Sequence, residues 1–366
     1  MIGVLMNWDA VEGLNLPVPA EFALPDYGGG SIANVPATVA KMLDVPFAGL
    51  PALPDALWWP LGDSIKRVVL LTLDGFGWNL FQARQDLVTA VTHRATITNQ
   101  LTSIFPSTTV AALSSLWTGV APAQHGMVGL HLFFPEYAVS AGMLDFSPLF
   151  FKMKDALVEA GLEPEKFLQQ PGMAEQLAAG GVPTYAFKGA EIVDSALSQM
   201  HGRGVADSFG SYAFAEMLVQ MREFLDEKAG ERLFINAYWP SIDTLSHVHT
   251  WQGTAVSAEL RAIFYQLQTE FFEALTDAAR KDTAFFIVAD HGQALTPVSH
   301  HIFLSDHPQL EKMLFMRPTG EPRVLYLYVK HGCRTAVIDY INTKLAHAMT
   351  AVLTQDALQA GLFAPD

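Results

Sequence analysis

Three long apolar segments, each ending in polar residues, constrain the fold of this chain more than any other feature of its sequence. They span residues 67–75, 232–240 and 283–292. Continuous runs of β-branched and aliphatic residues are typical of parallel strands that are covered on both faces. Helical periodicity lies between these runs, at 211–228 and 255–280. The alternation of strands and helices predicts an α/β fold with a mostly parallel central sheet flanked by helices on both faces.

The rest of the chain is expected to belong to the same α/β domain. Residues 1–66 are rich in Pro and Gly, which predicts loops that wrap over it. Three further elements are expected outside the apolar runs: a helix near 33–43, a strand at 323–330 and a helix at 334–353. Since no internal repeat or linker interrupts the sequence, we expect residues 1–366 to form a single domain, with its motifs within 67–330.

Composition and charge exclude several classes of protein. Half of the 366 residues are apolar, so the chain can bury a large core and is not globally disordered. The formal net charge of −15, without any basic run, argues against binding to nucleic-acid polymers or to anionic lipid. A single cysteine, Cys333, excludes an intramolecular disulfide and a cysteine-based zinc cluster.

The sequence carries no pattern that directs a chain to or through a membrane. Residues 1–9 lack the basic segment, apolar stretch and cleavage site of a signal peptide. No uninterrupted apolar run approaches the roughly 20 residues that a helix needs to cross a bilayer. We therefore expect a cytoplasmic protein with no membrane partner.

Acidic residues stand at or just beyond the end of each apolar run. They are Asp74, Asp243 and Asp290, and two of them have a histidine nearby, His247 and His291. Because the carboxyl ends of parallel strands lie on one edge of a sheet, these side chains can meet in space. Taken singly, each fits a turn, a helix cap or a solvated helix face. Taken together they favour a metal site, and carboxylate with imidazole suits zinc or manganese better than calcium.

A second group of polar residues lies within 105–119. Pro106 and the hydroxyl residues after it predict the start of a helix, with Val110 in its first turn. A hydroxyl group at a helix N-terminus lies where backbone N–H groups and the helix dipole favour an anion. Thr108 and Thr109 are therefore candidates for a nucleophile that attacks phosphorus or sulfur, and ordinary N-capping is the alternative.

Four motifs follow one another along the chain. They are Asp74-Gly75; the 105–109 stretch with Thr118-Gly119 and His125-Gly126 after it; Asp243 with His247 four positions later; and Asp290-His291-Gly292. In this order they resemble the alkaline phosphatase superfamily, and within it the type I phosphodiesterase/nucleotide pyrophosphatase branch, over about residues 67–330. Four motifs in order are far more specific than any one of them.

The resemblance implies a site that holds two divalent metal ions, with zinc as the expected metal and manganese as the alternative. It implies that Asp74, Asp290 and His291 hold one ion, which also binds the oxygen of the nucleophile. Asp243 and His247 would hold the other ion.

The resemblance also implies a Thr or Ser nucleophile that is transiently phosphorylated. In the family this residue lies nine positions before the Thr of the Thr-Gly pair, which selects Thr109 over Thr108. Zinc can stabilise the alkoxide form of a bound hydroxyl, as it lowers the pKa of bound water from 15.7 to about 7. Two ions roughly 3.5–4 Å apart can clamp the attacking and leaving oxygens of an in-line displacement. Ala112 replaces an Asn that the family's nucleotide pyrophosphatases usually carry to hold a phosphate oxygen, which weakens any prediction of nucleotide substrates.

The second metal site lacks an assigned third ligand. The family supplies a histidine, typically followed by glycine, downstream of the Asp-His-Gly motif. His300, His301 and His331 are the candidates, and of these only His331 precedes a glycine. No closing strand follows the apolar residues of 361–366, so we expect the chain to stop short of this ligand. The site of Asp243 and His247 would then be open or weakly occupied.

These observations predict a metal-dependent hydrolase of phosphodiester or pyrophosphate bonds in small phosphate esters. Phosphomonoester or phosphonate hydrolysis on the same site is one alternative, and a metal-binding protein with little turnover is another. Phe76, Trp78 and Trp239 could flank an organic leaving group. A sulfatase is excluded, because Cys333 lies outside the Cys/Ser-x-Pro-x-Arg context that those enzymes need.

Overall fold

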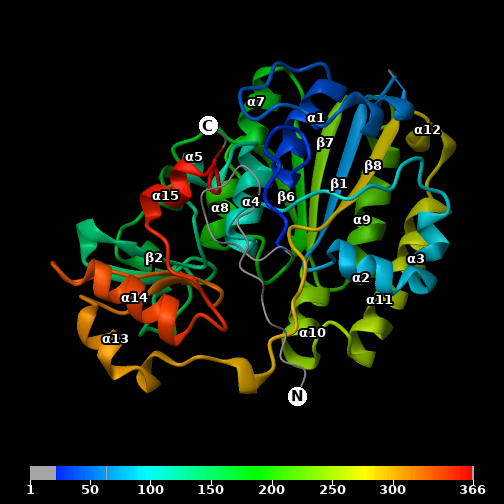
Figure 1. The fold of residues 1–366 in the computed structure, drawn as a ribbon. Coiled ribbons are helices and arrows are strands. Elements are labelled where there is room, and N and C mark those ends of the chain that lie inside the picture. The colour runs from blue at the N-terminus through cyan, green and yellow to red at the C-terminus, as the bar shows by residue number, and fades with distance from the viewer. Residues whose placement is uncertain (1–21, 63, 365–366) are drawn as a thin grey trace.

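A five-stranded parallel sheet forms the centre of the computed structural model, which describes residues 22–62 and 64–364 (Figure 1). Its strands are β1 (Arg67–Leu73), β5 (Thr184–Gly189), β6 (Val205–Ser211), β7 (Leu233–Trp239) and β8 (Thr283–Val288). They lie in the order β6-β5-β7-β1-β8, and every neighbouring pair is parallel. The predicted α/β class and the parallel central sheet are confirmed.

Helices cover both faces of this sheet. Alternate residues of β1 face opposite ways, so that Val68 and Leu70 belong to one core while Val69 and Leu71 belong to the other. The first core is closed by α1 (Val35–Met42), α4 (Thr109–Thr118) and α7 (Met173–Ala179). The second is closed by α3 (Gln85–Thr92), α9 (Phe214–Glu227), α10 (Ser241–His249) and α11 (Thr254–Gln266). Burial of β1 on both faces explains why its sequence is an almost uninterrupted apolar run.

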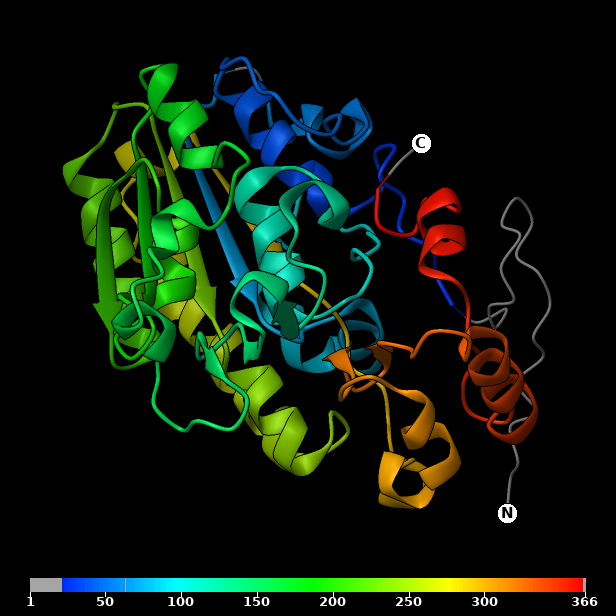
Figure 2. The same ribbon diagram turned by 90° about the vertical axis from the view of Figure 1, so that its left-hand side faces the viewer.

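A smaller antiparallel sheet lies beside the larger one (Figures 1 and 2). Its strands are β2 (His131–Phe134), β3 (Val139–Gly142), β4 (Ser147–Pro148), β9 (Thr319–Glu321) and β10 (Val324–Tyr326), in the order β10-β9-β2-β3-β4. Next to it, α13 (Pro308–Met313) and α14 (Arg334–Lys344) share a separate apolar cluster. Of this sheet only β10 falls within a predicted strand, the one expected at 323–330; the other four strands, of two to four residues, are too short to show an alternating pattern.

Most predicted elements are found at their expected places, with corrections in length. The helix expected near 33–43 is α1, and the one expected at 211–228 is α9. The long helix expected over 255–280 is interrupted: α11 ends at Gln266, a π-helical turn spans Leu267–Phe272, and α12 occupies Asp277–Arg280.

The two elements predicted near the C-terminal end are shorter than expected. Of the strand expected at 323–330, only β10 forms, and Val329 makes an isolated bridge with Leu314. The helix expected at 334–353 ends at Lys344. Asn342 explains this end, because its side chain accepts a hydrogen bond from the backbone N–H of Ala351 at 2.7 Å and donates one to the carbonyl oxygen of Ala351 at 3.2 Å, which turns the chain back.

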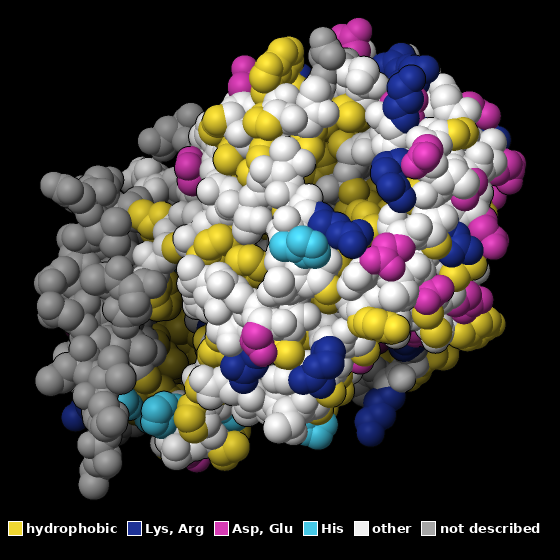
Figure 3. Space-filling view, turned by 90° about the vertical axis from the view of Figure 1, so that its right-hand side faces the viewer, with side chains coloured by type: hydrophobic (Ala, Val, Ile, Leu, Met, Phe, Trp, Pro, Cys, Tyr) yellow, Lys and Arg dark blue, Asp and Glu magenta, His cyan; other side chains and the backbone are white. Residues whose placement is uncertain are grey.

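The N-terminal segment is described only from residue 22. Residues 1–21, to which the signal-peptide analysis applies, and residues 365–366 lie outside the described part of the chain. The single-domain organisation over 1–366 stays a prediction. Within the described residues, no helix combines the length and the apolar character needed to cross a membrane. On the face shown in Figure 3, Lys and Arg side chains are scattered among Asp and Glu.

Buried polar side chains tie α4 to its neighbours. Ser114 Oγ lies 2.9 Å from Nε2 of His201 in α8 (Ala196–His201), and Ser115 Oγ lies 3.0 Å from Nε2 of His125. Burial lowers the pKa of His125 to about 3 and the pKa of His201 well below its usual value. Both rings are therefore neutral at pH 7, and α4 is fixed without burying an imidazolium charge.

Lys188 of β5 is buried beside α4, and its replacement by Met should stabilise the protein. Its Nζ donates to Ser198 Oγ at 2.9 Å and lies 5.2 Å from the centre of the Trp117 ring. Burial lowers the pKa of Lys188 from 10.5 to about 8. This shift corresponds to about 3 kcal/mol, and loss of the hydrogen bond offsets about 1 kcal/mol. We expect Lys188→Met to raise the free energy of unfolding at pH 7 by about 2 kcal/mol, measured by urea unfolding.

The pH dependence of this effect has a definite sign. Between the folded-state pKa of about 8 and the unfolded-state pKa of 10.5, the unfolded chain binds more protons at Lys188 than the folded chain does. The stability of the natural protein therefore rises with pH through this window, because Lys188 loses its charge in the folded state. The advantage of Lys188→Met should shrink from pH 8 to pH 10.5. A difference that stays constant across this range would contradict the prediction.

Candidate active site

The three predicted carboxylates meet at the carboxyl edge of the parallel sheet. Asp74 directly follows β1, Asp290 lies just beyond β8, and Asp243 lies in the first turn of α10, which begins after β7 (Figure 1). These strands are neighbours in the sheet, in the order β7-β1-β8. One ligand atom from each of Asp74, Asp243 and His291 lies within 4.8 Å of the other two. The edge therefore brings together a set of oxygen and nitrogen atoms that could hold a metal ion.

A glycine allows these elements to approach so closely. Gly75 has a positive φ of +72°, which L-residues with a side chain rarely adopt. A Cβ atom at this position would lie 3.1 Å from Cα of Asp243. Glycine at position 75 is thus required both for the turn after β1 and for the close contact with α10.

The two most buried carboxylates each have one oxygen held by the protein and one without a partner. Asp290 Oδ1 accepts hydrogen bonds from the backbone N–H of Gly75 at 3.1 Å and of His291 at 2.8 Å. Asp74 Oδ2 accepts a hydrogen bond from the Tyr238 hydroxyl. Asp74 Oδ1 and Asp290 Oδ2 are buried and have no hydrogen-bond partner among the described residues. They lie 3.4 and 3.5 Å from His291 Nε2.

The electrostatics of this cluster favour a bound cation. Burial, together with the nearby charges of Asp290 and Asp243, raises the pKa of Asp74 well above its usual range, although the hydrogen bond from Tyr238 opposes the shift. Burial and the charge of Asp74 likewise raise the pKa of Tyr238. Unpaired buried carboxylate oxygens are costly in a protein interior. A divalent cation would satisfy them and offset the repulsion, so the donor set fits a metal ion.

Thr109 is the hydroxyl residue that faces this cluster. It is the first residue of α4, and its Oγ1 lies 3.1 Å from His291 Nε2. Thr108 precedes it as the N-cap residue, but its side chain does not bond to the helix. The predicted nucleophile and the predicted metal ligand are thus neighbours, at the positive end of the helix dipole.

The second predicted pair lies at the rim of the site. His247 Nε2 is 3.4 Å from Asp243 Oδ2, and the His247 side chain is 73% exposed. The three candidates for a further ligand, His300, His301 and His331, are all exposed, and none belongs to the cluster that the described residues form. In this part of the chain, Asp243 and His247 therefore form a more open pair than the ligands around Asp74.

The structure adds two residues that the sequence analysis missed. Tyr238 donates to Asp74, and the Gln293 side chain donates to Asp243 Oδ1. The role of Tyr238 follows from its place in β7 next to β1, where it pairs with Thr72. Gln293 had a sequence signal, because it directly follows the Asp290-His291-Gly292 motif.

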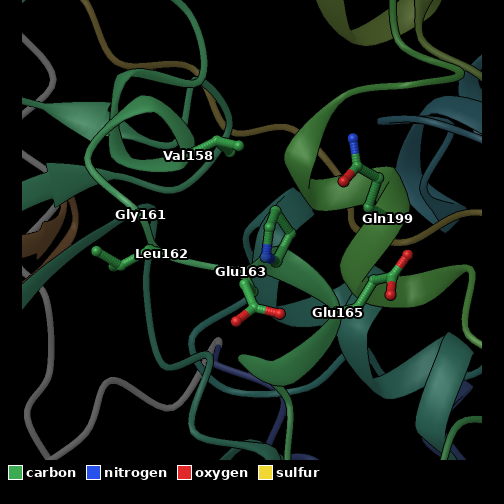
Figure 4. Close-up of a pocket in the computed structure, with 7 residues that line it drawn as sticks. Val158, Gly161, Leu162, Glu163, Glu165 and Gln199 are labelled. Atoms are coloured by element: carbon green, nitrogen blue, oxygen red, sulfur yellow. The ribbon is translucent and has the colours of Figure 1, made fainter.

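A separate surface hollow contains none of these residues. It is lined by Val158, Gly161, Leu162, Glu163, Pro164, Glu165 and Gln199 (Figure 4). Glu163 is ion-paired with Lys166 at 2.8 Å. The predicted site residues lie instead at the sheet edge described above.

Comparison with proteins of known structure supports the fold. Murine ectonucleotide pyrophosphatase/phosphodiesterase 5, an inactive variant in complex with AMP, has 16% identity and a TM-score of 0.55; the match covers 75% of this chain and 69% of that one. The human protein of the same name has 16% identity and a TM-score of 0.55, with 81% and 75% covered. Phosphonoacetate hydrolase from Sinorhizobium meliloti 1021, in complex with phosphonoformate, has 16% identity and a TM-score of 0.52, with 75% and 72% covered. At such low identity these likenesses concern the fold alone.

Comparison of the sequence with protein-family models identifies the family to which the chain belongs. No curated protein sequence is significantly similar to the chain. The sequence model of the family described as type I phosphodiesterase/nucleotide pyrophosphatase matches residues 68–363, which include every predicted site residue. The match confirms the resemblance carried by the four motifs. The chain belongs to the type I phosphodiesterase/nucleotide pyrophosphatase family, whose members are hydrolases of the alkaline phosphatase superfamily.

Proposed function

We propose that this protein hydrolyses phosphodiester or pyrophosphate bonds of small phosphate esters, using two divalent metal ions and a phosphothreonine intermediate on Thr109. The observation that carries the proposal is the 3.1 Å contact of the Thr109 hydroxyl with His291, beside buried carboxylates. A hydroxyl at the start of a helix, next to a cation-binding cluster, is suited to attack an anionic phosphorus centre.

The residues divide into two ligand sets. Asp74, Asp290 and His291 would hold one ion together with the Thr109 oxygen, and Asp243 and His247 would hold the other. The orphaned oxygens of Asp74 and Asp290 support the first set. Zinc is the expected metal, with manganese as the alternative, because the donors are carboxylate and imidazole. When bound, such ions lower the pKa of a coordinated hydroxyl and neutralise charge on the phosphoryl group.

The side chains and backbone of this chain then perform the displacement. Thr109 Oγ1 forms a bond to phosphorus as the bond to the leaving oxygen breaks, and the departing oxygen takes a proton. No side chain caps α4, so the first N–H groups of the helix can bind the phosphoryl oxygens. Water then attacks phosphorus and releases the phosphate with the regenerated Thr109 hydroxyl. Tyr238 and the backbone of Gly75 hold Asp74 and Asp290 in place throughout.

Phosphonate hydrolysis on the same site is a second candidate. One structural neighbour is a phosphonoacetate hydrolase, and Ala112 at a fully buried position offers no amide group to a nucleotide phosphate. Both reactions would use the same nucleophile and metal ligands, but in phosphonoacetate the bond that breaks joins phosphorus to carbon, and the departing CH₂ carbon takes the proton to give acetate.

A chelator experiment with three substrates tests the proposal. Protein loaded with zinc or manganese should hydrolyse bis-p-nitrophenyl phosphate faster than p-nitrophenyl phosphate. EDTA should abolish the activity, because the carboxylate cluster cannot activate Thr109 alone, and added metal should restore it. Release of phosphate from phosphonoacetate that is faster than hydrolysis of either p-nitrophenyl ester would favour phosphonate hydrolysis. If no substrate is turned over with either metal, the proposal is contradicted, and the remaining interpretation is a metal-binding protein without catalytic activity.

A further inference from the structure

A positively charged side chain from the smaller sheet reaches the segment that carries the nucleophile. Arg323 lies in the turn between β9 and β10, and its Nη2 donates to the carbonyl oxygen of Ser107 at 3.4 Å. Ser107 is two residues before Thr109, so their Cα atoms are at most about 7 Å apart. The smaller sheet thus brings a guanidinium group to the segment that leads directly into the nucleophile.

A buried carboxylate holds this arginine in position. Glu321 Oε2 lies 3.6 Å from Arg323 Nε, and the Glu321 side chain is only 8% exposed, whereas the Arg323 side chain is 46% exposed. One edge of the guanidinium is therefore anchored to the protein while other N–H donors remain accessible. An arginine has five such donors, and its fork geometry matches phosphate and carboxylate groups.

The charge around the site makes this arginine distinctive. The chain carries a formal net charge of −15, and Thr109 contacts His291, which lies in a cluster with the carboxylates of Asp74 and Asp243. Among the described residues, Arg323 provides the one Lys or Arg hydrogen bond to the 103–109 segment. An anionic substrate extending past the attacked phosphoryl group toward the smaller sheet would meet this positive charge.

We propose that Arg323 is a specificity-determining residue that binds a second anionic group of the substrate, next to the phosphoryl group that Thr109 attacks. The inference rests on the proposed function and narrows its substrate class. It selects compounds with two adjacent anionic groups, such as phosphoanhydrides, over simple diesters with a single negative charge. Arg323 takes no part in the bond changes at phosphorus.

Kinetic measurements on two substrates distinguish the binding of a second anionic group from an effect of Arg323 on the hydrolysis of every substrate. Arg323→Met should lower kcat/KM for ATP, cleaved between its α- and β-phosphates, by tenfold or more. It should change kcat/KM for bis-p-nitrophenyl phosphate by less than threefold, because that substrate has one anionic group. Arg323→Lys should retain more of the ATP activity. Arg317→Met, an exposed arginine of the same region, is the matched control and should leave both values unchanged.

Binding measurements decide the inference independently of turnover. By calorimetry in the Thr109→Ala background, which cannot turn ADP over, ADP should bind more tightly than AMP, and adding Arg323→Met should remove most of this preference. Equal losses for both substrates, or an ADP preference that survives in Arg323→Met, would overturn the role of Arg323 while leaving the proposed function intact. Should neither substrate be hydrolysed by the natural protein, the proposed function fails, and the ADP-to-AMP ratio still supports or refutes the anion site.

Discussion

Replacing Thr109 with Ala should lower kcat by about 10⁴-fold or more while the protein keeps its metal ions. The substitution removes the oxygen that attacks phosphorus in the proposed mechanism, so the covalent step would have no route. The carboxylates and His291 that form the rest of the cluster remain, and Val110, the next residue of α4, stays buried. The rate of bis-p-nitrophenyl phosphate hydrolysis and the metal content of the purified variant, measured by mass spectrometry, check both halves of the prediction.

Thr108→Ala is the control for this variant. Thr108 is the N-cap of α4, but its side chain makes no capping hydrogen bond, so its loss should change the rate only a few-fold. The structure favours Thr109 because its Oγ1 contacts His291 at 3.1 Å. An inactive Thr108→Ala together with an active Thr109→Ala would show that the nucleophile has been assigned one position too late.

The larger sheet and its acidic edge could be predicted because they follow from local patterns. A strand buried on both faces must be apolar throughout, and β1 shows this in its sequence. β1 and β7 are buried in this way, whereas β8 is a partly exposed edge strand that is apolar as well. Acidic residues lie at or just beyond the ends of these three strands, which are neighbours in the sheet, so they meet at one edge. The sequence alone predicts that the strands are parallel, but it does not predict that these three strands lie next to one another.

The remaining features depend on contacts that no local pattern records. β6 exposes polar residues such as Asp207 and Ser208 as an edge strand, so it lacks the apolar run that revealed β1. Tyr238 reaches Asp74 only because β7 pairs with β1 in one register. The placement of Arg323 against Ser107 depends on how the smaller sheet packs, and of that sheet only β10 falls within a predicted strand.

The second large effect is expected at the proposed metal ligands. Asp290→Asn or His291→Ala should each lower the zinc content by about one ion per chain and reduce kcat to near background. Asp290 is fully buried, and its Oδ2 has no partner among the described residues, so replacing it with an amide places a donor where a cation would bind. His291→Ala removes the imidazole next to Thr109. Metal titration followed by mass spectrometry, with the rate measured at each step, gives both quantities.

The two ligand sets should also differ in affinity, which makes this test more specific. The first set is buried and contains three protein ligands besides Thr109, whereas the second pairs Asp243 with a His247 side chain that is 73% exposed. We therefore expect one tightly bound zinc and one weakly bound zinc in the natural protein, and loss of the tight one in His291→Ala. His347→Ala, at an exposed histidine just after the end of α14, should change neither. A variant at Asp290 or His291 that keeps both ions and the full rate would show that this strand end is only a turn.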